Sequence, residues 1–358
     1  MALPPVVLGI DFGGTKIAAA VCDATGARLA TAVTASYCPA GDESPDLTET
    51  GALTRAGRPT PAELNFERGL RLARELLTEH APDRPLAGVG VATFGIPFDD
   101  RVELAPAIDG WESLPLGRKL AAAFPGVPVR MATDAKAAAQ AEVSWGSLAG
   151  CDPAIYVNLG TGLSAAIVAG GGVLAGGRGA AGEIGYSLRD RADIGRPASL
   201  RVPLEDMVSG QALQRRAAEL SGRPLTAAEV FAAGHDAALG DLLSEFIDEL
   251  AFHLVNLSIA VDPVRIAVGG GLTGSWERIR PRLQDALASA APYPPELVLA
   301  AFPAEAPLLG AVALAVEALS ASASRSAHST AAQPIGHYST NLANSAYLNA
   351  PTNSVTKG

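Results

Sequence analysis

Several residue types are scarce in this chain of 358 residues, and each scarcity excludes a class of protein. Its three cysteines, Cys22, Cys38 and Cys151, are too few and too scattered for a disulfide framework or a cysteine metal cluster. Aromatic residues make up only 5% of the chain, and Ala, Val, Leu and Gly carry most of the apolar content. No apolar run reaches about 18 residues, so no membrane-spanning helix is expected.

Basic charge is also scarce, because 27 Lys and Arg face 37 Asp and Glu and give a net charge of −10. Domains that bind the phosphate backbone of nucleic acids usually present a basic face. Residues 1–5 lack the basic segment of a secretory signal peptide. The sequence therefore predicts a cytoplasmic protein that binds neither nucleic acid nor membrane.

The abundant residues indicate a large folded protein, since 48% of the chain is hydrophobic and its length suggests two domains. We expect an N-terminal α/β domain over residues 1–132 and a C-terminal α/β domain over residues 133–307. A helix over residues 308–319 should pack back on the first domain. Residues 320–358, rich in Ser, Ala, Thr and Asn, resemble a disordered or appended tail. Residues 36–60 lack periodicity and predict a surface loop.

The first distinctive motif follows an apolar strand over residues 6–10. It contains a carboxylate, two glycines, a hydroxyl and a cation: Asp11, Gly13, Gly14, Thr15 and Lys16. Backbone N–H groups, a hydroxyl and a lysine suit a phosphate, and the aspartate suits Mg²⁺ or its water shell. Taken alone, the glycines could equally well only form the turn of a hairpin.

A second hairpin repeats this pattern, with Gly160, Thr161 and Gly162 between two apolar strands. A third glycine turn, Gly269 to Gly271, follows an apolar strand over residues 264–268. Such a repeat suggests an internal duplication with two phosphate-facing turns. The coincidence favours phosphate binding over a simple turn.

A carboxylate also lies where a strand meets a helix. Thr133 is a plausible N-cap with an alanine-rich helix behind it, so Asp134 should lie in the first turn. The helix dipole there favours an ionised carboxylate. In isolation, a simple capping role is the better interpretation, and a proton-accepting role remains open.

Six motifs in this order resemble the ROK family of sugar kinases, repressors and open reading frames over about residues 6–320. They are Asp-x-Gly-Gly-Thr-Lys from Asp11, Asp-Ala-x-x-Ala-Ala from Asp134, Leu-Gly-Thr-Gly from Leu159, Ala-Gly-Glu-Ile-Gly from Ala181, Leu-Glu-x-x-x-Ser-Gly from Leu204 and Val-Gly-Gly-Gly-Leu from Val268. The resemblance implies an α/β, actin-like ATPase (ribonuclease-H-like) fold, with two α/β domains around a central cleft. It also implies ATP, Mg²⁺ and transfer of the γ-phosphate to a hexose hydroxyl, usually O6.

The resemblance assigns roles residue by residue. Asp134 matches the catalytic base, Asp11 would hold Mg²⁺ through water, and Glu183 and Glu205 match sugar-contacting carboxylates. Thr133, Tyr186 and Gly95 are expected at the sugar site. The phosphate and nucleotide positions are Asp11, Gly13, Gly14, Thr15, Lys16, Gly160, Thr161, Gly162, Gly269, Gly270 and Gly271.

The chain departs from the family pattern at the sugar end. Thr133 and Lys136 stand where the family has asparagines, Ala107 replaces another asparagine, and Tyr186 replaces a histidine. The family zinc motif is missing, because residues 187–204 contain neither cysteine nor histidine. Zinc needs nitrogen or sulfur ligands at close spacing, so we expect no structural zinc.

These departures leave three functions open. A glucokinase-like enzyme is the default. An amino-hexose kinase, as in the kanosamine kinases, is an alternative because two carboxylates near the sugar would tolerate an ammonium group. A non-catalytic sugar sensor remains if Lys136 or Thr133 disables the site. The family's repressors need an N-terminal winged-helix domain, for which the hairpin at residue 8 leaves no room. Family members commonly form homodimers, which no stretch here predicts.

Overall fold

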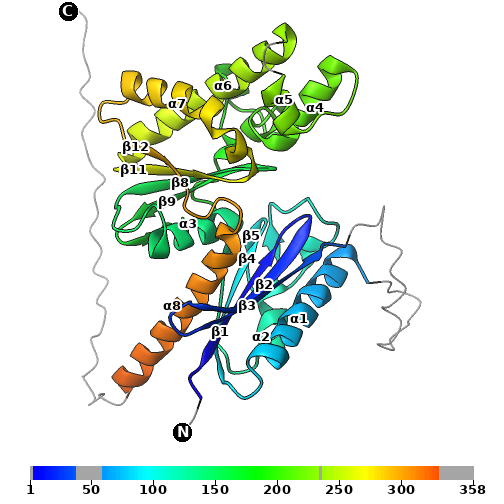
Figure 1. The fold of residues 1–358 in the computed structure, drawn as a ribbon, viewed down its shortest axis with the longest axis vertical. Coiled ribbons are helices and arrows are strands. Elements are labelled where there is room, and N and C mark those ends of the chain that lie inside the picture. Colours follow the sequence, from blue (N-terminus) through cyan, green and yellow to red (C-terminus); the bar gives the residue numbers. More distant parts are fainter. Residues whose placement is uncertain (1–2, 38–58, 234–235, 330–358) are drawn as a thin grey trace, which may run out of the picture.

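The computed structural model describes residues 3–37, 59–233 and 236–329, and these form two lobes that lie one above the other (Figure 1). Each lobe is built on a five-stranded sheet, and helices cover both. This confirms the predicted α/β class. Most of the predicted loop at residues 36–60, and residues 330–358 of the predicted tail, lie outside the described residues.

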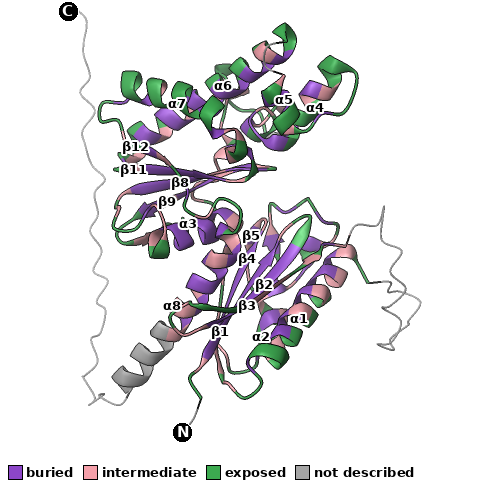
Figure 2. Cartoon of the chain, viewed as in Figure 1, coloured by how far each residue is buried: buried purple, intermediate pink, exposed green. Residues whose placement is uncertain are grey.

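The sheet of the lower lobe has the order β3-β2-β1-β4-β7, with β1, β4 and β7 parallel and the first two pairs antiparallel. Its strands are β1 (Val6–Phe12), β2 (Lys16–Asp23), β3 (Arg28–Ala35), β4 (Leu86–Thr93) and β7 (Val129–Thr133). Successive side chains of a strand point to opposite faces. Leu8 and Ile10 therefore pack in the cluster that includes helix α1 (Pro61–His80), while Val7 packs against helix α8 (Ala306–Ser329). Strands β1, β2 and β4 are correspondingly buried on both faces, whereas the edge strand β3 is partly exposed (Figure 2).

The sheet of the upper lobe repeats this topology in the order β10-β9-β8-β11-β12. Its strands are β8 (Ala154–Leu159), β9 (Leu163–Ala169), β10 (Gly172–Val173), β11 (Arg265–Gly269) and β12 (Glu296–Leu299). One face packs against α4 (Gly210–Ser221), α5 (Ala227–Ala232), α6 (Ala237–Val261) and α7 (Trp276–Ala290). The other face packs against α3 (Asp134–Trp145). The repeat places the turns β1–β2 and β8–β9 at equivalent positions in the two lobes.

Helices α3 and α8 pack against each other between the two sheets. The close approach depends on glycine. A Cβ at Gly90 of β4 would collide with the backbone of α8 at Ala311, and one at Gly310 would collide with the backbone of α3 at Ala137. Helix α8 also continues through residues 320–329, where the sequence predicted a tail. Alanine supports helix there, since Ala321, Ala323 and Ala327 are strong helix formers.

Capping groups set the helix boundaries that matter for the site. Thr133 caps α3 as predicted, its hydroxyl accepting a hydrogen bond from the Lys136 N–H at 3.3 Å. The segment before α4 is capped as well. A 3-10 turn (Leu204–Asp206) comes first, and α4 begins at Gly210 because the Ser209 hydroxyl caps the Ala212 N–H at 3.1 Å. Short connections complete the lower lobe: β5 (Ile96–Pro97), β6 (Val102–Glu103) and α2 (Leu116–Ala123).

Across the described ranges, no helix combines the length and the apolar character needed to cross a bilayer.

Candidate functional site

The β1–β2 turn is held by backbone hydrogen bonds and leaves one glycine open. The Gly13 N–H donates to the Lys16 carbonyl at 3.0 Å, and the Ser36 hydroxyl donates to the Gly13 carbonyl at 2.8 Å. No atom lies within 4 Å of the position that a Cβ at Gly14 would occupy. The turn is therefore rigid at its base and accessible to a ligand at Gly14. Thr15 and Lys16 are exposed beside it.

The β8–β9 turn is fixed to the start of a helix. The Gly210 N–H donates to the Gly160 carbonyl at 2.8 Å, and the Gln211 N–H donates to the Thr161 carbonyl at 3.2 Å. Helix α4 therefore begins directly beside this turn, and the positive end of a helix dipole favours anions. In the sequence, Ser209 and Gly210 were recognised only as part of a motif, and this contact was not predicted. The serine before Gly210 is the sequence signal that could have indicated a helix start beside this turn.

The three glycines after β11 have different surroundings. Gly269 ends the strand and packs against the ring of Tyr156, which a side chain would displace. Gly270 has φ of +94°, which favours glycine, and its missing Cβ lets the chain approach Leu159. Gly271 faces open space. Gly271 is thus the member of this turn with room for a ligand.

Asp134 is the first residue of α3 and lies at the C-terminal end of β7. One oxygen of its carboxylate accepts the Ala135 N–H at 2.7 Å. Asp11 is the penultimate residue of β1 and pairs with Ala92 of β4, which pairs with Ala132 of β7, so both aspartates lie at the same end of the sheet.

The two aspartates interact electrostatically. The pKa of Asp11 is raised to about 7, mainly by burial and also by the nearby Asp134 carboxylate, while Lys16 partly opposes this increase. The pKa of Asp134 is raised to about 6 in total, and burial is the largest cause, opposed by the Ala135 N–H. Glu183 and Glu205 add to that increase and Lys136 counteracts it. Residues from four separate segments thus converge around Asp134.

Glu183 and Glu205 are held together by close backbone packing. Glu183 precedes the 3-10 turn Ile184–Tyr186, and the Leu163 N–H donates to Glu205 Oε2 at 3.2 Å. A Cβ at Gly185 would come within 3.1 Å of Glu205 Oε2, so glycine there lets the two segments meet. Two carboxylates predicted to contact a sugar therefore lie at one site, near Asp134.

Tyr186 lies beside these carboxylates, and Gly95 lies two residues after the end of β4. Gly95 has φ of +75°, and a Cβ would come within 2.7 Å of the Glu103 carbonyl, so the tight turn itself requires glycine. Tyr186 is 41% exposed. Partial burial raises its pKa, and the carboxylates of Glu205, Glu183 and Glu112 raise it further.

Glu112 is a residue that the sequence analysis missed. It belongs to the lower lobe, follows the buried Trp111, and accepts the Ala105 N–H at 3.0 Å. It therefore supports the loop of residues 105–107, where the family asparagine is replaced by Ala107. A single glutamate in a polar loop gives no sequence signal of such a contact.

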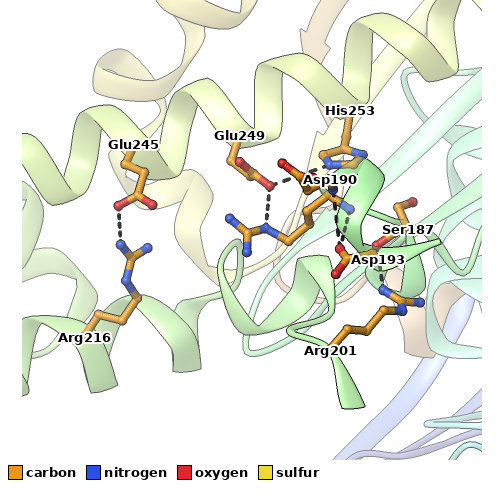
Figure 3. Close-up of polar contacts among 9 residues, drawn as sticks. Ser187, Asp190, Asp193, Arg201, Arg216, Glu245, Glu249 and His253 are labelled. Atoms are coloured by element: carbon orange, nitrogen blue, oxygen red, sulfur yellow. Dashed lines mark hydrogen bonds and ion pairs between the residues drawn. The ribbon is translucent and has the colours of Figure 1, made fainter. Parts of the chain in front are cut away.

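Polar contacts hold the segment in which the family has its zinc motif (Figure 3). Arg201 donates to the carbonyls of Ser187 at 3.0 Å and Tyr186 at 2.5 Å. Arg189 pairs with Glu249 of α6 at 2.5 Å. In residues 3–37, 59–233 and 236–329, no group of three or more His, Cys, Asp or Glu side chains is arranged to hold a metal ion. The predicted lack of structural zinc stays a prediction.

A family model described as the ROK family matches residues 7–318. The kanosamine kinase of Amycolatopsis mediterranei is 30% identical over 320 residues, which cover 87% of this chain and 96% of that protein. The beta-glucoside kinase of Listeria monocytogenes is 32% identical over 219 residues, covering 59% and 74%. The glucokinase of Streptomyces coelicolor is 28% identical and covers 76% and 84%.

Solved structures agree with these relatives. A ROK hexokinase from Thermus thermophilus superposes with a TM-score of 0.68 at 28% identity, covering 88% of this chain and 99% of that one. A ROK glucokinase from Streptomyces griseus, in complex with glucose and AMPPNP, gives a TM-score of 0.64 at 27% identity and covers 87% and 99%. The predicted actin-like fold and the family resemblance are therefore confirmed. The chain belongs to the ROK family, among its sugar kinases.

Proposed function

We propose that this enzyme transfers the γ-phosphate of ATP to a hexose hydroxyl, with O6 of glucose as the default acceptor position. The observation that carries this proposal is the position of Asp134. Its carboxylate interacts electrostatically with Asp11, which we assign to the nucleotide side, and with Glu183 and Glu205, which we assign to the sugar side. A phosphoryl donor and a hydroxyl acceptor would meet at such a carboxylate.

The open glycine turns would bind the phosphates. Gly14 and Gly271 have space in front of their backbones, and the turn at Gly160 adjoins the N-terminus of α4. Phosphoryl transfer depends mainly on positioning and on neutralising charge, which backbone N–H groups and Lys16 would supply. The nucleotide would lie against the third turn, at Gly271.

Asp11 fits a role in holding Mg²⁺. Its carboxylate is largely buried at the end of β1, and magnesium typically takes one or two carboxylates together with substrate phosphates and water. When bound there, the ion would neutralise negative charge on the phosphates.

Asp134 would act as the general base. Its carboxylate would accept a hydrogen bond from the acceptor hydroxyl, orient that oxygen toward the γ-phosphate and take its proton. Glu183 and Glu205 would accept hydrogen bonds from other sugar hydroxyls. A sugar lacking one of those hydroxyls would leave a carboxylate without its partner, and this is a strong source of specificity.

An amino-hexose is the second candidate acceptor. It is favoured by the kanosamine kinase relative, whose similarity covers nearly the whole of both proteins. The two carboxylates could also accept an ammonium group. A sensor without kinase activity is the third candidate, in which Thr133 or Lys136 would prevent catalysis.

A coupled ADP-release assay with product analysis separates these candidates. The panel should contain glucose, mannose, N-acetylmannosamine, glucosamine, kanosamine and a β-glucoside, each with ATP and Mg²⁺. We expect turnover with glucose and a 6-phosphate product. Tight sugar binding without turnover on any member of the panel would contradict a kinase and favour the sensor.

A further inference from the structure

A buried lysine reaches the carboxylates of the sugar site. Lys136 belongs to the first turn of α3, two residues after Asp134, and its side chain is only 7% exposed. Its Nζ lies 3.4 Å from Oε1 of Glu183, whose side chain is 22% exposed. A buried ammonium group requires a partner, because burying an unpaired charge is costly.

Acidic groups predominate around Asp134, and Arg130, another cation that lines the adjoining cavity, is paired with Glu317. The charged groups that shift the pKa of Asp134 are Glu183, Glu205 and Lys136. Among these described residues, Lys136 supplies the positive charge. Its stem also lines a cavity of about 370 Å³ beside the site, together with Thr133 and Gln140. Gln140 donates a hydrogen bond to Glu317 of α8 at 2.5 Å. Glu317 therefore already has a partner other than Lys136.

We propose that Lys136 is a specificity-determining residue. Because it pairs with Glu183, that carboxylate can still accept a hydrogen bond from an uncharged hexose hydroxyl but disfavours a second cation. An acceptor that brings an ammonium group to Glu183 would compete with Lys136 for the same oxygen and would meet its positive charge. This inference rests on the proposed function, because it assumes that Glu183 faces the acceptor.

The physical reason is the strength of charge interactions in a partly buried site. Two like charges a few ångströms apart repel far more strongly there than in water. A hydroxyl, by contrast, can donate to the free lone pairs of Glu183 while Lys136 stays in place. Replacing the family asparagine by lysine therefore changes which acceptors the site accepts, without altering Asp134.

The test compares kcat/KM for glucose with kcat/KM for glucosamine and kanosamine, at a pH at which the sugar amines are protonated. In the wild type we expect glucose to be preferred. In Lys136→Met, which keeps the apolar stem and removes the charge, we expect the preference for glucose to fall by about tenfold or more. The amino sugar should gain, because its ammonium takes the place of Nζ beside Glu183.

Two further variants make the outcome decisive. Lys136→Arg keeps the charge and should retain the wild-type preference. Lys119→Met is the matched control, because Lys119 lies over the ring of Phe66 in the lower lobe and outside the site. Calorimetric binding of the same sugars covers the case in which Lys136→Met turns over slowly.

An unchanged preference in folded Lys136→Met, by kinetics and by binding, would overturn the role of Lys136 while leaving the kinase proposal intact. Equal losses for all sugars would also overturn it, since they would show a purely structural contribution. Absence of turnover by the wild type on every sugar would instead contradict the proposed function.

Discussion

Asp134 combines the features that a general base requires. It lies at a helix start, uses one oxygen to accept the Ala135 N–H, and has a pKa raised by burial. We predict that Asp134→Asn lowers kcat by about 10²–10⁴-fold, the usual contribution of general base catalysis. The amide retains the shape and removes the proton acceptor. Steady-state kinetics with the preferred sugar measures this effect.

ATP binding provides the control for this variant. Titration calorimetry should give an ATP affinity within a few-fold of the wild type, because the turns at Gly14 and Gly160, which we propose to bind the phosphates, are unchanged. Activity near the wild-type level in Asp134→Asn would show that another group accepts the proton.

The raised pKa of Asp134 also predicts the pH dependence. A base must be deprotonated, so kcat/KM should rise with pH and level off above an apparent pKa of about 6. Lys136 lowers the pKa of Asp134, so Lys136→Met should move this acid limb to higher pH. Profiles of kcat/KM at saturating Mg²⁺ and ATP measure it. An acid limb at the pKa of an ordinary exposed aspartate would contradict the burial of Asp134.

At the scale of elements, the sequence predicted the strands, helices and glycine turns well because their signals are local. The apolar strands predicted over residues 6–10 and 264–268 correspond to β1 and β11, with bounds that differ by at most two residues. Thr133 was identified as an N-cap from its position before an alanine-rich run. Hydrophobic period, capping and glycine turns each depend on a few neighbouring residues.

The sugar end of the site was predicted less well because its contacts join segments that are distant in sequence. Lys136 was identified only as a departure from the family pattern, and its pairing with Glu183 depends on how α3 meets the upper lobe. Likewise, the influence of Glu112 on Tyr186 acts between the two lobes. No local pattern encodes such pairs.

Glu142 links the far end of α3 to the segment before α8. Its fully buried carboxylate accepts the backbone N–H groups of Ser147 at 2.7 Å, Ala301 at 3.1 Å and Phe302 at 2.9 Å. We predict that Glu142→Ala lowers the free energy of unfolding by about 3 kcal/mol, because buried N–H groups lose a charged acceptor. Urea denaturation followed by circular dichroism measures the change.

Glu142→Gln is the matched variant, since its amide oxygen can still accept one or two of these hydrogen bonds. It should lose clearly less stability than Glu142→Ala. Equal stability of Glu142→Ala and the wild type would show that water replaces the carboxylate at these N–H groups.

At the scale of the whole molecule, the two similar lobes meet along α3 and α8. Asp134 begins one of these two helices, and Gly310 of the other permits their close contact. A change in the angle between the lobes would therefore act directly on the carboxylate proposed as the base. Closure of the lobes over both substrates would also exclude water from the phosphoryl group.

The segment between Tyr186 and Leu204 provides the last prediction, because it joins the two carboxylates of the upper lobe that we propose to contact the sugar. Hydrogen bonds from Arg201 and the pair Arg189–Glu249 fix it to its own start and to α6. We therefore predict that the purified protein contains substoichiometric zinc. A zinc-selective chelator, added with excess Mg²⁺, should change neither kcat nor the melting temperature. Elemental analysis measures the zinc content, the kinase assay measures kcat and calorimetry measures the melting temperature. The variant Glu249→Gln weakens the contact to α6 and should raise the KM for sugar more than the KM for ATP. One tightly held zinc per chain would mean that ligands other than this ion-pair network order the segment.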